Sequence, residues 1–224
     1  MRTFVTTAPI AAHLDIPAGR IRLVAGDRTD TTSVKVLPAN AAERRDIAAA
    51  ERIQVGYGDG VLRVEAPEAG NRLFGDSGSV EVVVHLPAGS TVEGRAAAAD
   101  LRGTGRLGDV VFEAARATVE LEETGSARLA LQEGDITLGR LGGPARITTR
   151  KGDLTVAEAT RGTVVLRTEH GDITVGAARG TSAALDAGTA YGRIHNALRN
   201  TDGTAAALTV QATTAYGDVT ARTI

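Results

Sequence analysis

The chain repeats one short phrase four times between Thr149 and Gly217. Each copy has a threonine, two variable residues, a glycine, then aspartate or arginine and an aliphatic residue: TRKGDL, TEHGDI, TAYGRI and TAYGDV. With a partial copy, QEGDI, the repeat glycines stand at positions 134, 152, 171, 192 and 217, which are 18, 19, 21 and 25 residues apart. A period near 20 is too short for helical hairpin repeats, which need about 33 to 47 residues. The spacing predicts one coil of a β-solenoid per repeat.

Around each glycine the residues alternate between small apolar and polar types. With the glycine as position zero, we expect positions −7, −5 and −3 and the aliphatic residue after the turn to face inward. In the repeat of Gly171 these residues are Val164, Leu166, Thr168 and Ile173. Either a parallel solenoid or an antiparallel meander of hairpins fits this pattern. The equivalent residues match in size from repeat to repeat, which favours the parallel solenoid because its coils stack directly on one another.

Residues 1–87 read as strands plus one helix, continuous with solenoid repeats that occupy residues 88–224. The expected strands are Arg20–Val24, Ser33–Leu37, Val61–Ala66 and Ser79–Leu86. The stretch NAAERRDIAAAER predicts a helix over about 41–52, and Asn40 and Glu43 have the spacing of a capping box. We expect this helix to cover an open end of the solenoid, where strand backbone would otherwise be unpaired.

Composition excludes several classes of function. Lys and Arg number 25 and Asp and Glu 27, so the net charge of −2 does not indicate a nucleic-acid partner. The absence of cysteine excludes disulfides, thiol catalysis and Cys-based zinc sites. Three Phe, three Tyr and no Trp indicate a thin interior without a deep pocket. No stretch reaches the roughly 20 apolar residues of a membrane span, and the first residues lack a signal-peptide-like apolar run, so we expect no membrane insertion and a cytoplasmic location.

The order of these segments resembles a known family. The helix NAAERRDIAAAER is followed by GSVEVVVHLPAGSTVE and then by serial GDITV-like units. This arrangement resembles the putative-adhesin family of bacterial β-strand-repeat proteins, of the type common in actinobacteria, over essentially the whole chain. The resemblance implies a β-solenoid and no established enzyme chemistry.

The repeated acids are the first candidates for chemistry. Asp109, Asp135, Asp153, Asp172 and Asp218 would form a column that could bind Ca²⁺ or act in acid–base catalysis. The turn role is favoured instead, because aspartate after glycine tolerates tight corners and hydrogen-bonds its own turn backbone. Arg193 also interrupts the column in the sequence. The four histidines form no metal-binding or triad pattern, so we predict no catalytic, cofactor-binding or metal-binding residues.

The residue before each repeat glycine varies in chemistry while its neighbours do not. Glu133, Lys151, His170, Tyr191 and Tyr216 should form one column along a solenoid edge, with the two tyrosines on adjacent coils about 4.8 Å apart. Lys151, His170, Tyr191 and Tyr216 are therefore the predicted surface binding strip, for a protein or carbohydrate partner. An aromatic ladder that only stabilises the corner is the alternative.

The sequence thus predicts a non-enzymatic binding or scaffolding module for another macromolecule. The alternative is a carbohydrate-active or other enzyme with a site on one solenoid face. The last repeat runs into Ile224 without a helix or proline after it. We therefore also expect the C-terminal strand to be an open edge through which the chain can self-associate.

Overall fold

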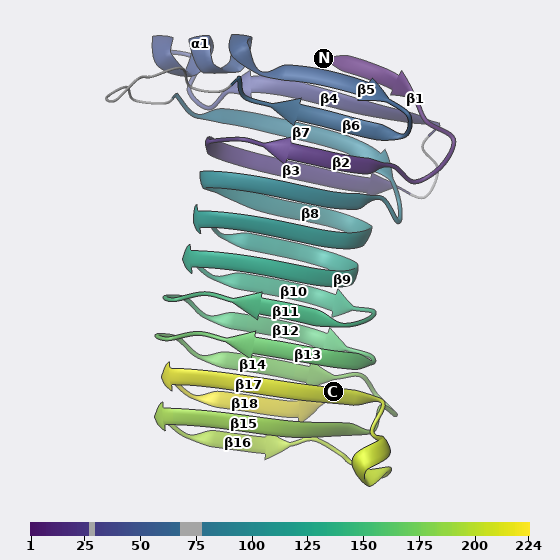
Figure 1. Ribbon diagram of the computed structural model, residues 1–224, viewed down its shortest axis with the longest axis vertical. Helices are drawn as coiled ribbons and strands as arrows, with labels where there is room; N and C mark the ends of the chain where they lie inside the picture. The colour runs from purple at the N-terminus through teal and green to yellow at the C-terminus, as the bar shows by residue number, and fades with distance from the viewer. Residues whose placement is uncertain (27–29, 68–77) are drawn as a thin grey trace. The chain divides into compact units, whose positions relative to one another are not determined.

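A computed structural model describes residues 1–26, 30–67 and 78–224 (Figure 1). The chain divides into two compact units, Met1–Arg116 and Ala117–Ile224. In both units most strand pairs are parallel, and the described residues contain one α-helix, which lies in the N-terminal part. The predicted fold class, an all-β solenoid with one short N-terminal helix, is confirmed.

The N-terminal unit has the strands β1 (Arg2–Val5), β2 (Ala11–Asp15), β3 (Ala18–Gly26), β4 (Thr31–Pro38), β5 (Gln54–Gly58), β6 (Val61–Glu65), β7 (Val80–Pro87) and β8 (Thr91–Arg116), with the helix α1 (Arg44–Arg52) between β4 and β5. The four strands expected from the sequence are all present as β3, β4, β6 and β7, and prolines end two of them. β1, β2 and β5 were not expected.

The first coil of this unit is inserted into the stack. β2 pairs in parallel with β6 on one side and with the start of β8 on the other, and β3 pairs in parallel with β7 and with the middle of β8. Figure 1 shows β2 and β3 between β6–β7 and β8. β1 and β4 add antiparallel strands beyond β7, and β5 adds one beyond β6. Apart from β5 and β6, the strands that pair in this unit are therefore not neighbours in sequence.

The helix α1 starts later than the sequence predicts, and the expected capping box does not form. Glu43 is the N-cap residue and makes no side-chain cap bond. The buried carboxylate of Asp46 instead accepts hydrogen bonds from the backbone N–H of Asn40 at 3.1 Å and of Ser79 at 2.9 Å. Asp46 thus ties the first turn of α1 to the segment that enters β7. α1 packs chiefly on β4 and β7, and its role as a cover for an open end stays a prediction.

The C-terminal unit has the strands β9 (Val119–Glu133), β10 (Ile136–Leu141), β11 (Ala145–Thr148), β12 (Leu154–Ala159), β13 (Gly162–Arg167), β14 (Ile173–Ala177), β15 (Ala183–Tyr191), β16 (Ile194–Ala197), β17 (Leu208–Tyr216) and β18 (Val219–Thr223), with a 3₁₀ turn, η1 (Gly203–Ala205), before β17. Each coil contributes one strand to each of two parallel layers. One layer has the order β9, β11, β13, β17, β15, and the other has the order β9, β10, β12, β14, β18, β16.

The last coil of the chain lies inside this stack and not at its end. β17 pairs with both β13 and β15, and β18 pairs with both β14 and β16. In Figure 1 the yellow strands β17 and β18 accordingly separate β13–β14 from β15–β16. The prediction that the C-terminal strand is an open edge is wrong, because both edges of β18 are paired. The coil β15–β16 ends the stack instead.

The core of the C-terminal unit is a thin column of aliphatic side chains, as the period predicts. Register-equivalent residues after the turn are at most 1% exposed in four coils: Ile136, Leu154, Ile173 and Val219. Before the turn the same holds for Ile147, Val164, Leu166, Val210 and Ala212. Among the positions expected to face inward, those of the terminal coil are the exception, because Leu185 and Ala187 are half-buried and Ile194 is 46% exposed. No further coil of this unit covers their inner face.

Candidate functional site

The repeated threonine serves the corner between the two layers. In every complete repeat its hydroxyl donates a hydrogen bond to the glycine carbonyl of a neighbouring coil: Thr149 to Gly134 (3.4 Å), Thr168 to Gly152 (3.1 Å), Thr214 to Gly171 (2.9 Å) and Thr189 to Gly217 (3.0 Å). The hydroxyl thus supplies a hydrogen bond to a glycine carbonyl that lies in the turn, outside the hydrogen-bond ladder of the strands. The three-residue spacing from threonine to glycine is therefore a structural requirement of the corner.

The repeat glycines leave no space for a side chain. A Cβ atom on Gly171 would lie 2.1 Å from the carbonyl oxygen of Gly152, and one on Gly217 would lie 2.1 Å from that of Gly171. Both glycines also have a positive φ, +151° and +149°. Close stacking of the coils and backbone conformation together explain why glycine recurs here.

The repeat aspartates form a ladder between coils. One carboxylate oxygen of each accepts the backbone N–H of the equivalent residue on the next coil, at 2.7 to 2.8 Å: Asp135 from Asp153, Asp153 from Asp172, Asp172 from Asp218 and Asp218 from Arg193. They are turn residues, as predicted, but they bond the neighbouring coil and not their own turn. Asp109, the other acid of the predicted column, lies within β8.

Arg193 ends the aspartate ladder on the terminal coil. Its backbone N–H and its guanidinium both donate to Asp218, at 2.8 Å and 3.0 Å. These two bonds, the backbone bond first, lower the pKa of the Asp218 carboxyl below its ordinary value of 3.8. In the sequence Arg193 interrupts the acids, whereas in space it closes their column, because β17–β18 is inserted before β15–β16. Among the described residues, no group of three or more His, Asp or Glu side chains is placed to hold a metal ion.

The residues before the glycines form the predicted column, which we call the corner strip: Glu133, Lys151, His170, Tyr216 and Tyr191. The Lys151 ammonium lies 3.8 Å from a Glu133 carboxylate oxygen. The rings of His170 and Tyr216 stack with centroids 4.8 Å apart and 9° between planes, and those of Tyr216 and Tyr191 with 4.8 Å and 5°. The prediction that the two tyrosines lie on adjacent coils at this spacing is confirmed.

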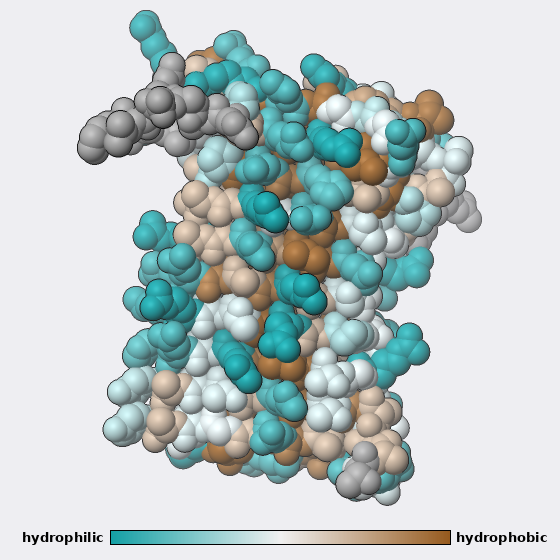
Figure 2. All heavy atoms as spheres, viewed as in Figure 1, coloured by the Kyte–Doolittle hydropathy of each residue, from teal (hydrophilic) through white to brown (hydrophobic). Residues whose placement is uncertain are grey.

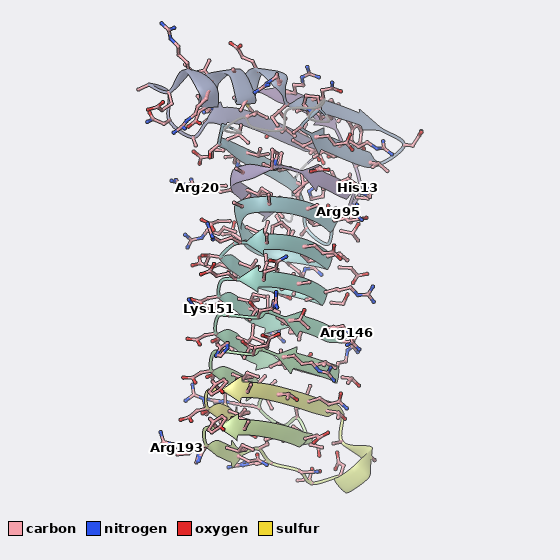
Figure 3. All side chains as sticks on the ribbon, turned by 60° about the vertical axis from the view of Figure 1, so that its left-hand side comes forward. His13, Arg20, Arg95, Arg146, Lys151 and Arg193 are labelled. Atoms are coloured by element: carbon pink, nitrogen blue, oxygen red, sulfur yellow. The ribbon has the colours of Figure 1, made fainter. Side chains whose placement is uncertain are left out.

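The order within the corner strip differs from the order in the sequence. Tyr216 lies between His170 and Tyr191, so both of its ring faces are covered, yet it is 51% exposed through its ring edge and hydroxyl. Tyr191 ends the stack and is 67% exposed, and Tyr216 is its one ring partner among the described residues. Figure 3 shows Lys151 and Arg193 projecting from the same corner of the unit. The corner strip therefore offers to solvent an ion pair, ring edges, two hydroxyls and the outer face of Tyr191.

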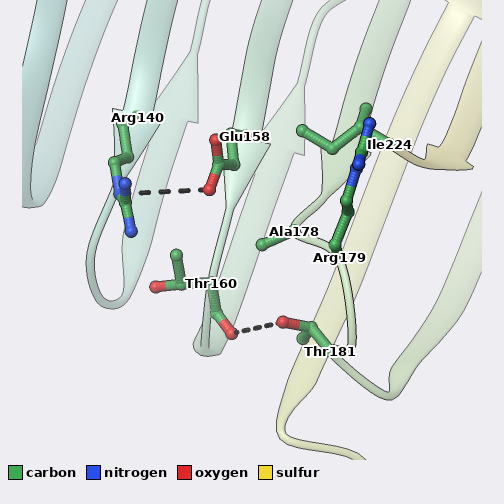
Figure 4. Close-up of a pocket in the computed structure, with 7 residues that line it drawn as sticks. All are labelled: Arg140, Glu158, Thr160, Ala178, Arg179, Thr181 and Ile224. Atoms are coloured by element: carbon green, nitrogen blue, oxygen red, sulfur yellow. Dashed lines mark hydrogen bonds and ion pairs between the residues drawn. The ribbon is translucent and has the colours of Figure 1, made fainter.

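Two shallow hollows also lie on the C-terminal unit. One, about 480 Å³, is lined by Arg140, Glu158, Thr160, Ala178, Arg179, Thr181 and Ile224 (Figure 4). The other, about 570 Å³, lies over Leu131, Thr148, Thr149, Arg150, Arg167, Thr168, Glu169 and Thr213. Each contains one acid, and each acid faces an arginine, Glu158 with Arg140 at 4.0 Å and Glu169 with Arg150 at 3.6 Å. Neither hollow brings together the two free carboxylates that general acid–base hydrolysis of a glycoside requires.

The histidines do not gather at any of these places. His13 lies 3.4 Å from a Glu93 carboxylate, and His85 lies 3.3 Å from the hydroxyl of Ser33. His195 is exposed on β16, as its outward position predicts. Of the four, only His170 belongs to the corner strip.

The chain belongs to the Toastrack DUF4097 family, which residues 51–223 match. Among curated proteins, none matches the chain significantly. The described residues contain no helix that is both long enough and apolar enough to span a membrane.

Solved structures with the same fold include a putative adhesin from Bacteroides fragilis NCTC 9343. It is 14% identical, with a TM-score of 0.61, and the match covers 98% of this chain and 95% of that one. A putative adhesin from Parabacteroides distasonis ATCC 8503 is 15% identical with a TM-score of 0.44, covering 100% and 95%. A putative lipid binding protein from the same strain is 10% identical with a TM-score of 0.47, covering 98% and 95%.

Proposed function

We propose that this Toastrack protein is a non-enzymatic binding module that holds a macromolecular partner at the corner strip. The observation that carries the proposal is the stack of His170, Tyr216 and Tyr191, three exposed rings at one corner of a chain with only three tyrosines. The Bacteroides fragilis structure of the same fold is named a putative adhesin, which agrees with a binding role. The actinobacterial type and the cytoplasmic location stay predictions.

A protein partner fits the corner strip better than a carbohydrate. Sugar recognition by aromatic residues uses a free ring face, and in this stack both faces of Tyr216 are covered, so Tyr191 is the one tyrosine with an open face. Ring edges and hydroxyls, by contrast, suit the mixed apolar and hydrogen-bonding contacts of protein interfaces, where tyrosine is enriched. Stacking also holds the rings in one conformation before binding, which lowers the entropic cost of the interface.

The enzymatic alternative needs a concave site with free acids. In each of the two hollows described above, the single acid faces an arginine. This arrangement favours binding over catalysis.

The experiment uses the full chain as bait in a lysate of its native host, in three versions. The first is the wild type, the second carries Lys151→Ser, His170→Ser and Tyr191→Ser, and the third carries Arg146→Ser as a control on an exposed site of β11. We expect a partner that the wild type and control capture in stoichiometric amount and the triple variant does not. A glycan array with the same proteins tests the carbohydrate version. If the triple variant captures the same partner as the wild type and no glycan distinguishes them, the corner strip is not the binding site.

A further inference from the structure

We propose that the terminal coil of the C-terminal unit, β15 and β16, is a dimerisation surface that pairs with the same coil of a second copy of the chain. We call this surface the open end. The proposal does not depend on the corner strip being a binding site, although Tyr191 belongs to both surfaces.

The backbone of β15 directs hydrogen-bonding groups away from the stack. Successive residues of a strand point their N–H and C=O groups to alternate sides. The Ser182 carbonyl accepts the N–H of Leu208, which leads into β17, whereas the Ala183 N–H donates to Arg199 on the opposite side. The same alternation continues along β15, so the peptide groups of residues 185, 187 and 189 face away from β17. β15 and β16 each have their strand partner on one side only among the described residues, β17 and β18 respectively.

Core side chains are uncovered at the same place. Ile194 is 46% exposed, whereas its register equivalent on the inserted coil, Val219, is 1% exposed. Leu185 and Ala187 are half-buried, although their partners on β17 are at most 1% exposed. Figure 2 shows apolar atoms reaching the rim of the molecule at this end. The open end thus combines backbone groups that have no strand partner in the described part of the chain with partly exposed side chains of the hydrophobic core.

Natural edge strands are normally protected by lysine, proline, a bulge or short length. β15 is nine residues long and reads AALDAGTAY, and β16 reads IHNA. Neither contains lysine or proline, and Asp186 is the only acid or base other than His195 in the two strands. β15 therefore lacks the usual devices that prevent pairing, and β16 has only its short length of four residues.

A second copy is the occupant that matches both strands at once. A single peptide strand would pair with β15 or with β16 and leave the core between them open, whereas the same end of a second copy presents two strands around an identical core. A two-fold axis reverses the strand direction, so the two copies would pair in the antiparallel manner and close the assembly as a dimer. The charges are compatible with self-pairing, because residues 183–197 contain one acid, Asp186, and one strong base, Arg193. Two copies of this surface face each other without an excess of like charge.

The test is the mass of the full chain in solution across a concentration series, by sedimentation velocity and equilibrium. The wild type should approach twice the monomer mass of 23.0 kDa. Ala187→Pro removes an N–H that faces the free edge without removing a bond to β17, and Ala187→Lys adds a charge to the uncovered core. Each should weaken association by about tenfold or more. Ala190→Lys, on the outward face of the same strand, is the control and should dimerise like the wild type.

Amide hydrogen exchange gives a second readout that a general loss of stability would not mimic. In the wild type, exchange at residues 185, 187 and 189 should slow as the concentration rises, while the interior strand β17 stays protected throughout. Both variants at position 187 should retain the circular dichroism of the wild-type monomer. A wild type that stays monomeric at every concentration overturns the proposal. So does a dimer that both variants leave intact, an assembly that grows beyond the dimer, or exchange at these amides that ignores concentration.

Discussion

The hydroxyl of Thr214 offers the clearest test of how the corners hold the coils together. Thr214 is 2% exposed and donates to the carbonyl of Gly171 at 2.9 Å. Thr214→Val keeps the shape and the β-branched side chain but leaves that carbonyl without its donor. A neutral hydrogen bond contributes about 0.5–1.5 kcal/mol, and a buried group left unpaired costs about 1–3 kcal/mol. We therefore expect the free energy of unfolding to fall by about 1–2 kcal/mol.

Thr189→Val is the matched control, because Thr189 makes the same bond to Gly217 at 3.0 Å on the half-exposed terminal coil. Water can replace its hydroxyl there, so we expect a loss below about 0.5 kcal/mol. Urea unfolding of dilute protein, followed by circular dichroism, should show a lower midpoint with an unchanged slope for Thr214→Val. Equal losses at the two positions, or no loss at Thr214, would refute the assignment of the threonine to the corner bond.

Three further predictions concern the same columns. Leu166→Asp should lower the free energy of unfolding by several kcal/mol, because it buries an unpaired carboxylate. Asp153→Asn keeps the acceptor for the next coil, so in calorimetry it should melt within a few degrees of the wild type. Similar melting temperatures for these two variants would show that Leu166 is not in the core. Gly171→Ala should prevent folding or strongly destabilise the fold, since the added Cβ would lie 2.1 Å from a carbonyl oxygen. A Cβ at Gly188 would have no atom within 4 Å, so Gly188→Ala should leave the stability measured by urea unfolding nearly unchanged. Equal effects of the two substitutions would contradict the close stacking of the coils. The pKa of Asp218 is lowered in the folded chain, so its stabilising contribution is present above pH 3.8 and is lost as the pH falls through the folded value. Amide exchange in β16 should then accelerate at that acid limit in the wild type, and Asp218→Asn should abolish this step; a step that survives the substitution would exclude Asp218 as its cause.

The sequence predicts the fold well because stacking places equivalent residues of every repeat in the same environment. Glycine, threonine and the inward aliphatic residues recur since every coil meets the same carbonyl, the same corner and the same core. The spacing of Tyr191 and Tyr216 follows from that regularity, as does the turn role of the aspartates.

The order of the coils could not be predicted from the same pattern. Any coil of matching phase can stack on any other, so the repeats do not reveal that β17–β18 precedes β15–β16 in space. One signal was available: the glycine spacing grows from 18 or 19 residues to 25 between Gly192 and Gly217, and the extra residues carry the chain past a coil. The same limitation hid the role of Arg193, which ends the aspartate column only in the observed order.

Contacts between distant and irregular segments also lay outside the reach of the pattern. Asp46 reads as an ordinary acid in the first turn of a helix, and its bond to Ser79 depends on the position of β7. The absence of a capping bond at Glu43 has the same cause, since Asp46 accepts the Asn40 N–H that a capping box would have used.

The insertion of the C-terminal coil, β17–β18, sets both the order of the corner strip and the location of the open end. The chain has no cysteine, so engineered pairs can be tested directly for disulfide formation. Thr163 is the register partner of Thr209, and Thr209 is the partner of Ala184, so Thr163 and Ala184 are two strands apart. We expect a cysteine pair at 163 and 209 to form an intramolecular disulfide under mild oxidation, and a pair at 163 and 184 not to form one. A disulfide between 163 and 184, with none between 163 and 209, would show that the coils stack in sequence order and that β17–β18 is not inserted.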